Sequence, residues 1–360
     1  MHHTMTVAAP ARTVTSRRPA VAVKSDVKTG HDIAYLTRGH ASGCAGAMAY
    51  YTRTGDPPGT WEGRGCAALG VSGTVEAEVA ERLYQEGVGP GGERIIQHAA
   101  PKTGEDQAAA EAAAIARYRE EHPFASASEL NAERTRIRAT SPGISRPYYD
   151  LTSSASKSVS VLHASLRVAA AQAREAGDDV TAAALDGEAQ AIEDALRDSV
   201  REGLELLEAM ACYVRTGHHS KDTGEWRDGK GLVATSWLHT ISRDGDPQLH
   251  IHLAVLNAVQ RADGADDTWR AADGQHFYQL RHMYGVTVDR AFEQRLLDMG
   301  YAMTGRADGN GAEVGGVSQQ VMDRFSSRAR AIGGKLRTWV DQYTATHGKP
   351  PSRRTIYLMG

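Results

Sequence analysis

The 360-residue chain has few cysteines and no long apolar run, and these two absences narrow the classes of protein it can belong to. Its three cysteines, Cys44, Cys66 and Cys212, are widely spaced and odd in number, which fits neither a disulfide framework nor a zinc-binding pair. No apolar stretch approaches the ~20 residues of a membrane-spanning helix. We therefore expect a protein of the reducing cytoplasm without membrane insertion.

The chain also lacks an excess of charge of either sign. Its 41 Lys and Arg residues against 44 Asp and Glu residues give a formal net charge of -3. This balance excludes a uniformly basic nucleic-acid coat but allows a local basic surface. The phosphate loop of nucleotide-driven motors is missing as well, because Gly229-Lys230 and Gly334-Lys335 lack the rest of that motif.

Length and composition bound the organisation of the chain. With 41% hydrophobic residues, 360 residues are enough for one large domain or two smaller ones. Residues 1–28 contain one acid, Asp26, and predict a disordered basic arm. We expect residues 29–360 to form one domain, with residues 270–360 as its helical C-terminal part.

Hydrophobic periodicity predicts mainly helices outside the arm, with a short strand over residues 148–152 and a strand hairpin within residues 232–260. The region 166–213 suits either one long helix or a hairpin with its corner at residues 177–179. The other helices are expected over residues 74–87, 105–121, 156–168, 270–300 and 317–346.

Three histidines are the most informative feature that is present. His250 and His252 alternate with the apolar Ile251, so on a strand both imidazoles point to the same face. A turn signal at residues 244–247 would fold a strand that holds His239 back against them. A histidine on a strand is more often structural, but three imidazoles placed in this way can converge on one divalent cation. The spacing alone does not indicate which reaction such a site would catalyse.

Residues 149–160 (Tyr-Asp-Leu-Thr-Ser-Ser-Ala-Ser-Lys-Ser-Val-Ser), read together with the histidines, carry a resemblance to a known family. Further blocks lie at residues 61–65 (Trp-Glu-Gly-Arg-Gly), 69–73 (Leu-Gly-Val-Ser-Gly) and 325–328 (Phe-Ser-Ser-Arg). In these ordered blocks the chain resembles the relaxase domain of conjugative plasmids, the TrwC/TraI (MobF) type of HUH endonucleases. Their name describes a His-hydrophobic-His motif.

The resemblance implies a fold and an activity. The fold is α+β, an antiparallel sheet with helices packed on it and a mobile helical segment over the DNA-binding cleft. The activity is that of a strand transferase that nicks plasmid DNA at the origin of transfer and forms a 5′-phosphotyrosyl intermediate during conjugation. No segment resembles the helicase domain that members of the family often carry C-terminally.

The resemblance also implies which tyrosines react. The family carries tyrosines near its N-terminus, and here Tyr35 occupies the first position while Tyr50 and Tyr51 occupy the second. We assign strand cleavage to Tyr35 and a second transfer to either Tyr50 or Tyr51, with aromatic packing as the alternative for these two. A phenol with a pKa near ~10 needs a base or a cation to become a nucleophile at neutral pH.

Several polar residues would complete the site. Asp150 would orient one histidine or accept the tyrosine proton, with a turn residue at the end of a strand as the alternative. Arg243 would contact a phosphate, with a solvated turn residue as the alternative. Lys157, at the start of a helix, would contribute to an anion site, with a plain helix cap as the alternative. Phosphate contacts are also expected from four arginines, for which a solvated face is the alternative: Arg134, Arg136, Arg138 and Arg146.

The cofactor expected at His239, His250 and His252 is a divalent metal ion. The resemblance implies Mg²⁺ or Mn²⁺, whereas three nitrogen ligands suit zinc, nickel or copper better than Mg²⁺, so the identity of the metal stays open. The implied partners are single-stranded DNA at the transfer origin, accessory relaxosome proteins and a type IV coupling protein.

Three other functions remain as alternatives. A rolling-circle replication initiator or transposase of the HUH class would share the site, but it usually places its tyrosines after the histidine strand. A non-cleaving autoregulator that binds the origin would need no nucleophile. A histidine-triad nucleotidyl hydrolase or transferase would carry a further histidine where this chain has Ala254.

Overall fold

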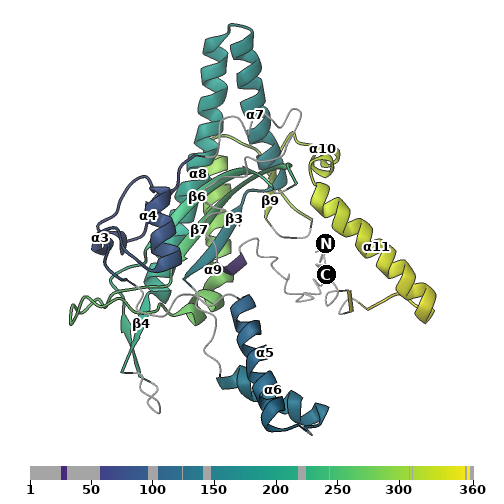
Figure 1. Ribbon diagram of the computed structural model, residues 1–360. Helices are drawn as coiled ribbons and strands as arrows, with labels where there is room; N and C mark the ends of the chain where they lie inside the picture. The colour runs from purple at the N-terminus through teal and green to yellow at the C-terminus, as the bar shows by residue number, and fades with distance from the viewer. Residues whose placement is uncertain are drawn as a thin grey trace, which may run out of the picture.

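A five-stranded antiparallel sheet forms the centre of the protein (Figure 1). Its strand order is β1-β3-β7-β6-β2. The strands are β1 (Asp26–Gly30), β2 (Thr60–Glu62), β3 (Tyr148–Ser154), β6 (Ala234–Ile241) and β7 (Pro247–Leu256). The computed structural model describes residues 26–30, 57–95, 104–123, 125–140, 147–217, 224–242, 244–307, 309, 311–352 and 355–356.

The central strand β7 gives the sheet two faces of different character. Leu249, Ile251 and Leu253 point to one face, and His250 and His252 point to the other, because side chains alternate along a strand. The three apolar side chains are each at most 1% exposed. The apolar face of β7 is therefore anchored in a core while the other face holds the histidines.

Three long helices cover the apolar face of the sheet: α7 (Lys157–Glu175), α8 (Asp179–Ala211) and α9 (Gly274–Asp298). The first two form a hairpin that rises beyond the sheet in Figure 1. Gly177 occupies its corner with a φ of 78°, a conformation that favours glycine. The Asp178 side chain accepts from the Thr181 N–H at 3.1 Å and caps α8. The corner predicted at residues 177–179 is confirmed.

Shorter helices pack on the histidine face, towards β2. They are α3 (Cys66–Leu69), α4 (Ala77–Glu81) and the π-helix η1 (Arg82–Glu86). A second apolar core joins them to the sheet through Trp61, Tyr84, Tyr148 and Trp237. The helix predicted over residues 74–87 is confirmed, with a π-helical last turn.

The remaining elements include two two-stranded ribbons, β4–β5 and β8–β9, which reach the larger core through Val214 and Val314. Figure 1 shows α5 and α6 as one projection and α11 as another. Their bounds are β4 (Tyr213–Thr216), β5 (Glu225–Asp228), β8 (Met303–Gly305), β9 (Ala312–Val314), α5 (Gly104–Glu121), α6 (Ala127–Thr140), α10 (Gln319–Arg324) and α11 (Ser327–His347).

Two expectations about boundaries are wrong. The arm expected over residues 1–28 ends earlier, because residues 26–28 pair with β3 as part of β1. The helix expected over residues 317–346 is two helices, since the chain leaves the helical conformation at Phe325 and Ser326. The β8–β9 ribbon lies between the two regions expected to be helical, 270–300 and 317–346.

The α+β class with an antiparallel sheet is confirmed. Within the residues that the structure describes, no helix combines the length and the apolar character needed to cross a bilayer.

Candidate metal centre

The hairpin of β6 and β7 brings the three histidines together. His239 pairs directly with His250, and Trp237 pairs with His252. One nitrogen of each imidazole lies within 4.8 Å of the others, and the ring centroids are 5.1–5.3 Å apart. The convergence predicted from the spacing and the turn signal is therefore confirmed.

Hydrogen bonds fix the ring nitrogens of two of these histidines. His250 Nδ1 lies 2.8 Å from the carbonyl oxygen of Gln248, and His252 Nδ1 lies 2.9 and 3.0 Å from the carboxylate oxygens of Asp150. A carbonyl and a carboxylate accept hydrogen bonds, so Nδ1 is the donor and the Nε2 lone pair is left for a metal. These residues fit a divalent cation that takes nitrogen ligands.

Asp150 reaches His252 from the neighbouring strand β3, where its side chain is buried. The Thr152 hydroxyl adds a second polar group to this pair, 3.2 Å from His252 Nδ1 and 3.5 Å from an Asp150 oxygen. The carboxylate thus lies where it can orient an imidazole, which is one of the two roles expected for it.

The turn of the hairpin is held by the start of α7. Lys157 Nζ donates to the Pro247 carbonyl at 2.8 Å, and the Leu249 N–H donates to Ser160 Oγ at 3.1 Å. Burial lowers the pKa of the Lys157 ammonium. The Ser158 N–H, in the first turn of α7, donates to the Glu313 carboxylate at 3.0 Å. These contacts favour a structural role for Lys157, and its contact with DNA stays a prediction.

The other expected site residues are only partly described. Arg134 and Arg136 lie on α6, where Arg136 forms an ion pair with Glu133 at 2.6 Å. Arg138 also lies on α6, but its side chain is not among the described ones. The remaining expected residues lie outside the described part of the chain: Tyr35, Tyr50, Tyr51, Arg146 and Arg243.

Sequence reasoning missed a buried polar chain beside the histidines. Trp237 Nε1 donates to Thr235 Oγ1 at 2.9 Å, the Thr235 hydroxyl lies 3.2 Å from the Tyr84 hydroxyl, and the Tyr84 hydroxyl donates to the Ala254 carbonyl at 2.8 Å. Burial raises the pKa of Tyr84, so its phenol keeps the proton and is unsuited to nucleophilic attack. The spacing of Thr235, Trp237 and His239 could have indicated this chain, because residues two apart on a strand point to the same face.

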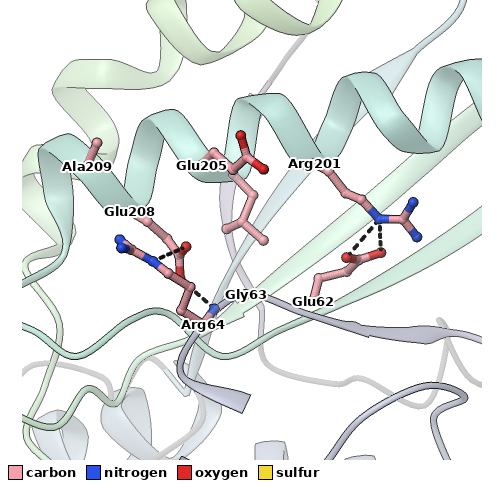
Figure 2. A pocket seen from close by; sticks show the side chains of 8 residues that line it. Glu62, Gly63, Arg64, Arg201, Glu205, Glu208 and Ala209 are labelled. Atoms are coloured by element: carbon pink, nitrogen blue, oxygen red, sulfur yellow. Dashed lines mark hydrogen bonds and ion pairs between the residues drawn. The ribbon is translucent and has the colours of Figure 1, made fainter. Parts of the chain in front are cut away.

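The block at residues 61–65 has a structural role on the other face of the sheet. Glu62 and Arg64 line a pocket of about 500 Å³ beside α8. In Figure 2 their side chains meet Arg201 and Glu208 of that helix. Glu208 accepts from the Arg64 N–H and Nε, both at 2.8 Å, and Arg201 pairs with Glu62 at 3.1 Å. These ion pairs fasten the edge strand β2 to α8.

The β4–β5 ribbon carries an exposed aromatic group. Trp226 is 48% exposed, the Arg215 guanidinium lies 5.6 Å from its ring centroid, and His276 of α9 meets its edge. An exposed indole beside an arginine suits base stacking and phosphate contact.

The fold and the site together define a class: an α+β domain whose central antiparallel hairpin holds three converging histidines that could bind a metal ion, beside a buried aspartate. A family profile described as TrwC relaxase matches residues 29–359. The chain belongs to this family.

One relative is similar in sequence, and solved structures share the fold. The multifunctional conjugation protein TraI of Escherichia coli is 30% identical over 195 residues, which cover 52% of this chain and 9% of TraI. The chain thus spans a small part of the length of that relative. A copper-bound structure of the conjugative relaxase TrwC with oriT DNA has a TM-score of 0.56 at 23% identity, covering 93% of this chain and 88% of that one. A second metal-bound TrwC structure with oriT DNA has a TM-score of 0.55 at 21% identity, covering 92% and 88%.

Proposed function

We propose that the protein is a metal-dependent DNA relaxase that nicks one strand at an origin of transfer and holds the cut end on a tyrosine. The observation that carries this proposal is the convergence of His239, His250 and His252, backed by Asp150, in a chain of the TrwC relaxase family. The structures of TrwC with oriT DNA support the same substrate class for this chain.

The histidines would hold a divalent cation against the scissile phosphate. When bound, such an ion neutralises the charge that develops on the non-bridging oxygens. Asp150 fixes the His252 imidazole in the orientation that presents Nε2. The copper-bound TrwC structure supports a site that accepts a transition metal, and Mg²⁺ or Mn²⁺ remains our proposal for the working ion.

The nucleophile in this proposal is Tyr35. Its phenol oxygen would attack the phosphorus, the bond from phosphorus to the 3′ oxygen would break, and the leaving oxygen would take up a proton as the free 3′-OH. The phenol proton would pass to Asp150 or to water. Tyr50 or Tyr51 would carry out the second transfer that rejoins the strand, and Arg243 would contact the phosphate.

The DNA strand would be held by basic and aromatic side chains. Trp226 and Arg215 on the β4–β5 ribbon supply one such surface. Further phosphate contacts are proposed for Lys157 and for the arginines of residues 134–146. Accessory relaxosome proteins and a type IV coupling protein are the further proposed partners, and the cytoplasm is the proposed location.

Family membership disfavours the competing functions. A replication initiator or transposase of the HUH class would use the same metal centre. An autoregulator that only binds the origin would share the DNA surface. A cleavage experiment distinguishes it from a relaxase, because the autoregulator would bind DNA without cutting it.

The test is cleavage of single-stranded oligonucleotides tiled across the protein's own replicon, with Mn²⁺ and with EDTA. We expect one oligonucleotide to be cut at one position with Mn²⁺ and none to be cut with EDTA. Tyr35→Phe should abolish cutting and leave DNA affinity within about twofold, because it removes one hydroxyl. Full activity of this variant would move the nucleophile to Tyr50 or Tyr51, and binding without cutting by the wild type would support the autoregulator.

A further inference from the structure

The α10–α11 junction is bound to the turn of the histidine hairpin through one carboxylate. Asp246 Oδ2 accepts from the Ser327 N–H at 2.6 Å, and Asp246 Oδ1 accepts from the Ser327 hydroxyl at 3.1 Å. The two residues are 81 positions apart in the chain. Asp246 is 9% exposed, and both hydrogen bonds are partly buried.

Asp246 is itself fixed within the hairpin turn. Its N–H donates to Ser242 Oγ at 3.1 Å, and its carbonyl accepts from the Ser242 N–H at 2.8 Å. The carbonyl of the next residue, Pro247, accepts a hydrogen bond from the Lys157 ammonium. Four residues of extended chain, about 13 Å, then lead to His250. The carboxylate therefore has a defined position relative to the metal centre.

The Asp246 carboxylate also replaces a cap that α11 lacks. Ser326 is the N-cap residue of α11 but makes no side-chain capping bond, because its hydroxyl donates to the Met322 carbonyl at 2.7 Å. The first turn of the helix contains no acidic residue. A carboxylate on an N-terminal N–H satisfies a free donor and complements the helix dipole, so the hairpin turn anchors the start of α11.

Beyond this anchor α11 is exposed and basic. Over Ser327–His347, all of which the structure describes, the helix has no buried residue. It carries Arg328, Arg330, Lys335 and Arg337 against one acid, Asp341. Arg330 folds back onto the α10–α11 junction, where it donates to the Arg324 carbonyl and to Ser327 Oγ. Lys335 and Arg337 lie further along the exposed helix and are suited to contact phosphates.

We propose that Asp246 is a positioning residue that fixes α11 against the turn of the histidine hairpin, so that the basic helix and the metal centre engage the same DNA strand. The helix is about 31 Å long. Its anchor, Asp246, is separated from His250 by about 13 Å of extended chain. This inference rests on the proposed function, because it requires a DNA strand at the metal centre.

The test is a double-mutant cycle on the affinity of the Mn²⁺-loaded protein for a mixed-sequence single strand. In the wild type, Lys335→Ala/Arg337→Ala should weaken binding and flatten the dependence of log K on log salt by about 1.4, the value for two lost phosphate contacts. Asp246→Ala should weaken binding to a similar degree. Combining the changes should add little, because the helix is already misplaced. Effects that add in full would overturn the proposal.

A second readout separates positioning from a general structural role. Asp246→Ala should raise KM for DNA while kcat at saturating DNA and the Mn²⁺ affinity stay within about twofold of the wild type. Loss of Mn²⁺ binding instead would assign Asp246 to the metal centre and contradict the proposal. Asp246→Asn, which keeps one acceptor for Ser327, should show a smaller effect. Asp244→Asn, an exposed neighbour in the same turn, is the matched control.

Two further outcomes are distinguishable. If Asp246→Ala does not fold, Ser327→Ala takes its place in the cycle, and full additivity with the α11 double variant again overturns the proposal. If the wild type binds no single strand at all, the proposed function fails and this inference fails with it. Normal wild-type binding with additive variants contradicts only the role of Asp246.

Discussion

The two faces of the central sheet use the same strands for different purposes. On β7, Ile251 and Leu253 enter a core formed with α7, α8 and α9, whereas His250 and His252 project from the opposite face and meet His239. The same strand pairing decides which side chains point to each face, since successive side chains along a strand alternate between the faces. The apolar face therefore supplies the rigidity that keeps three nitrogen donors within 4.8 Å of one another.

The histidine face of the sheet combines an apolar core with paired polar groups. Its own core contains Trp61, Tyr84 and Trp237, and its polar groups are joined in specific pairs such as Asp150 with His252. Burying a polar group without a partner is costly. A change on either face should consequently have a distinct signature, in stability for one and in metal chemistry for the other.

The largest effect is expected on the histidine face. His250→Ala should leave folding nearly intact but reduce Mn²⁺ affinity and cut strand cleavage by roughly a hundredfold or more, as for the loss of one electrostatic contribution to the transition state. Calorimetric metal titration and the cleavage assay measure the two effects. His282→Ala, an exposed histidine of α9, is the control. Full activity of His250→Ala would contradict the assignment of metal binding and cleavage to the histidine face.

The matching change on the apolar face is Ile251→Ala, one residue along. Ile251 is 1% exposed, so its truncation should lower the free energy of unfolding by about 2–5 kcal/mol. The protein that remains folded should bind Mn²⁺ normally. Denaturant unfolding gives the stability, with the half-exposed Val286→Ala as the control. A loss of metal affinity at full stability would show that the faces are not separable.

A smaller effect is expected for Asp150→Asn. The amide can still accept from His252 Nδ1 but no longer carries a charge, so Mn²⁺ affinity should fall by about 10- to 100-fold. Titration of the purified variant with Mn²⁺ tests this, and Asp298→Asn on the surface of α9 serves for comparison. Unchanged affinity would remove Asp150 from the support of the metal centre.

The smallest effect is expected for the pH dependence of stability. Each of the two apolar cores contains one buried thiol, Cys66 in one and Cys212 in the other. Burial raises the pKa of Cys66 and of Cys212 to about 11 from 9.0. Between these values the folded protein binds more protons than the unfolded chain, so the stability these thiols contribute is present below pH 9 and is lost as the pH rises towards 11. Each thiol should contribute a slope of at most ~1.4 kcal/mol per pH unit.

Denaturant unfolding at pH 8 and at pH 10.5 measures this loss. Cys66→Ala and Cys212→Ala should each reduce it by a similar amount, because the two cores exclude water equally well. A reduction by only one of the variants would show that one of the cores admits water.

How far the sequence predicts this molecule depends on the range of the contacts. The period-two pattern of His250 and His252, together with a turn signal, is local, and so is the corner at Gly177. These predictions are confirmed. The pairing of β1 with β3 and the contacts of Ser158 with Glu313 and of Asp246 with Ser327 join residues 81 or more positions apart. No local pattern encodes these contacts, so the end of the arm and the supports of the hairpin were missed.

A covalent DNA adduct would show directly that the protein cuts DNA through a tyrosine. The protein would be incubated with Mn²⁺ and the oligonucleotide that it cuts, or with a random-sequence single-stranded pool, denatured in SDS and mapped by mass spectrometry. We expect a 5′-phosphotyrosyl bond on Tyr35 in the wild type and none in His250→Ala. An adduct on a histidine, or no adduct from a folded and metal-loaded protein on any DNA, would contradict this expectation.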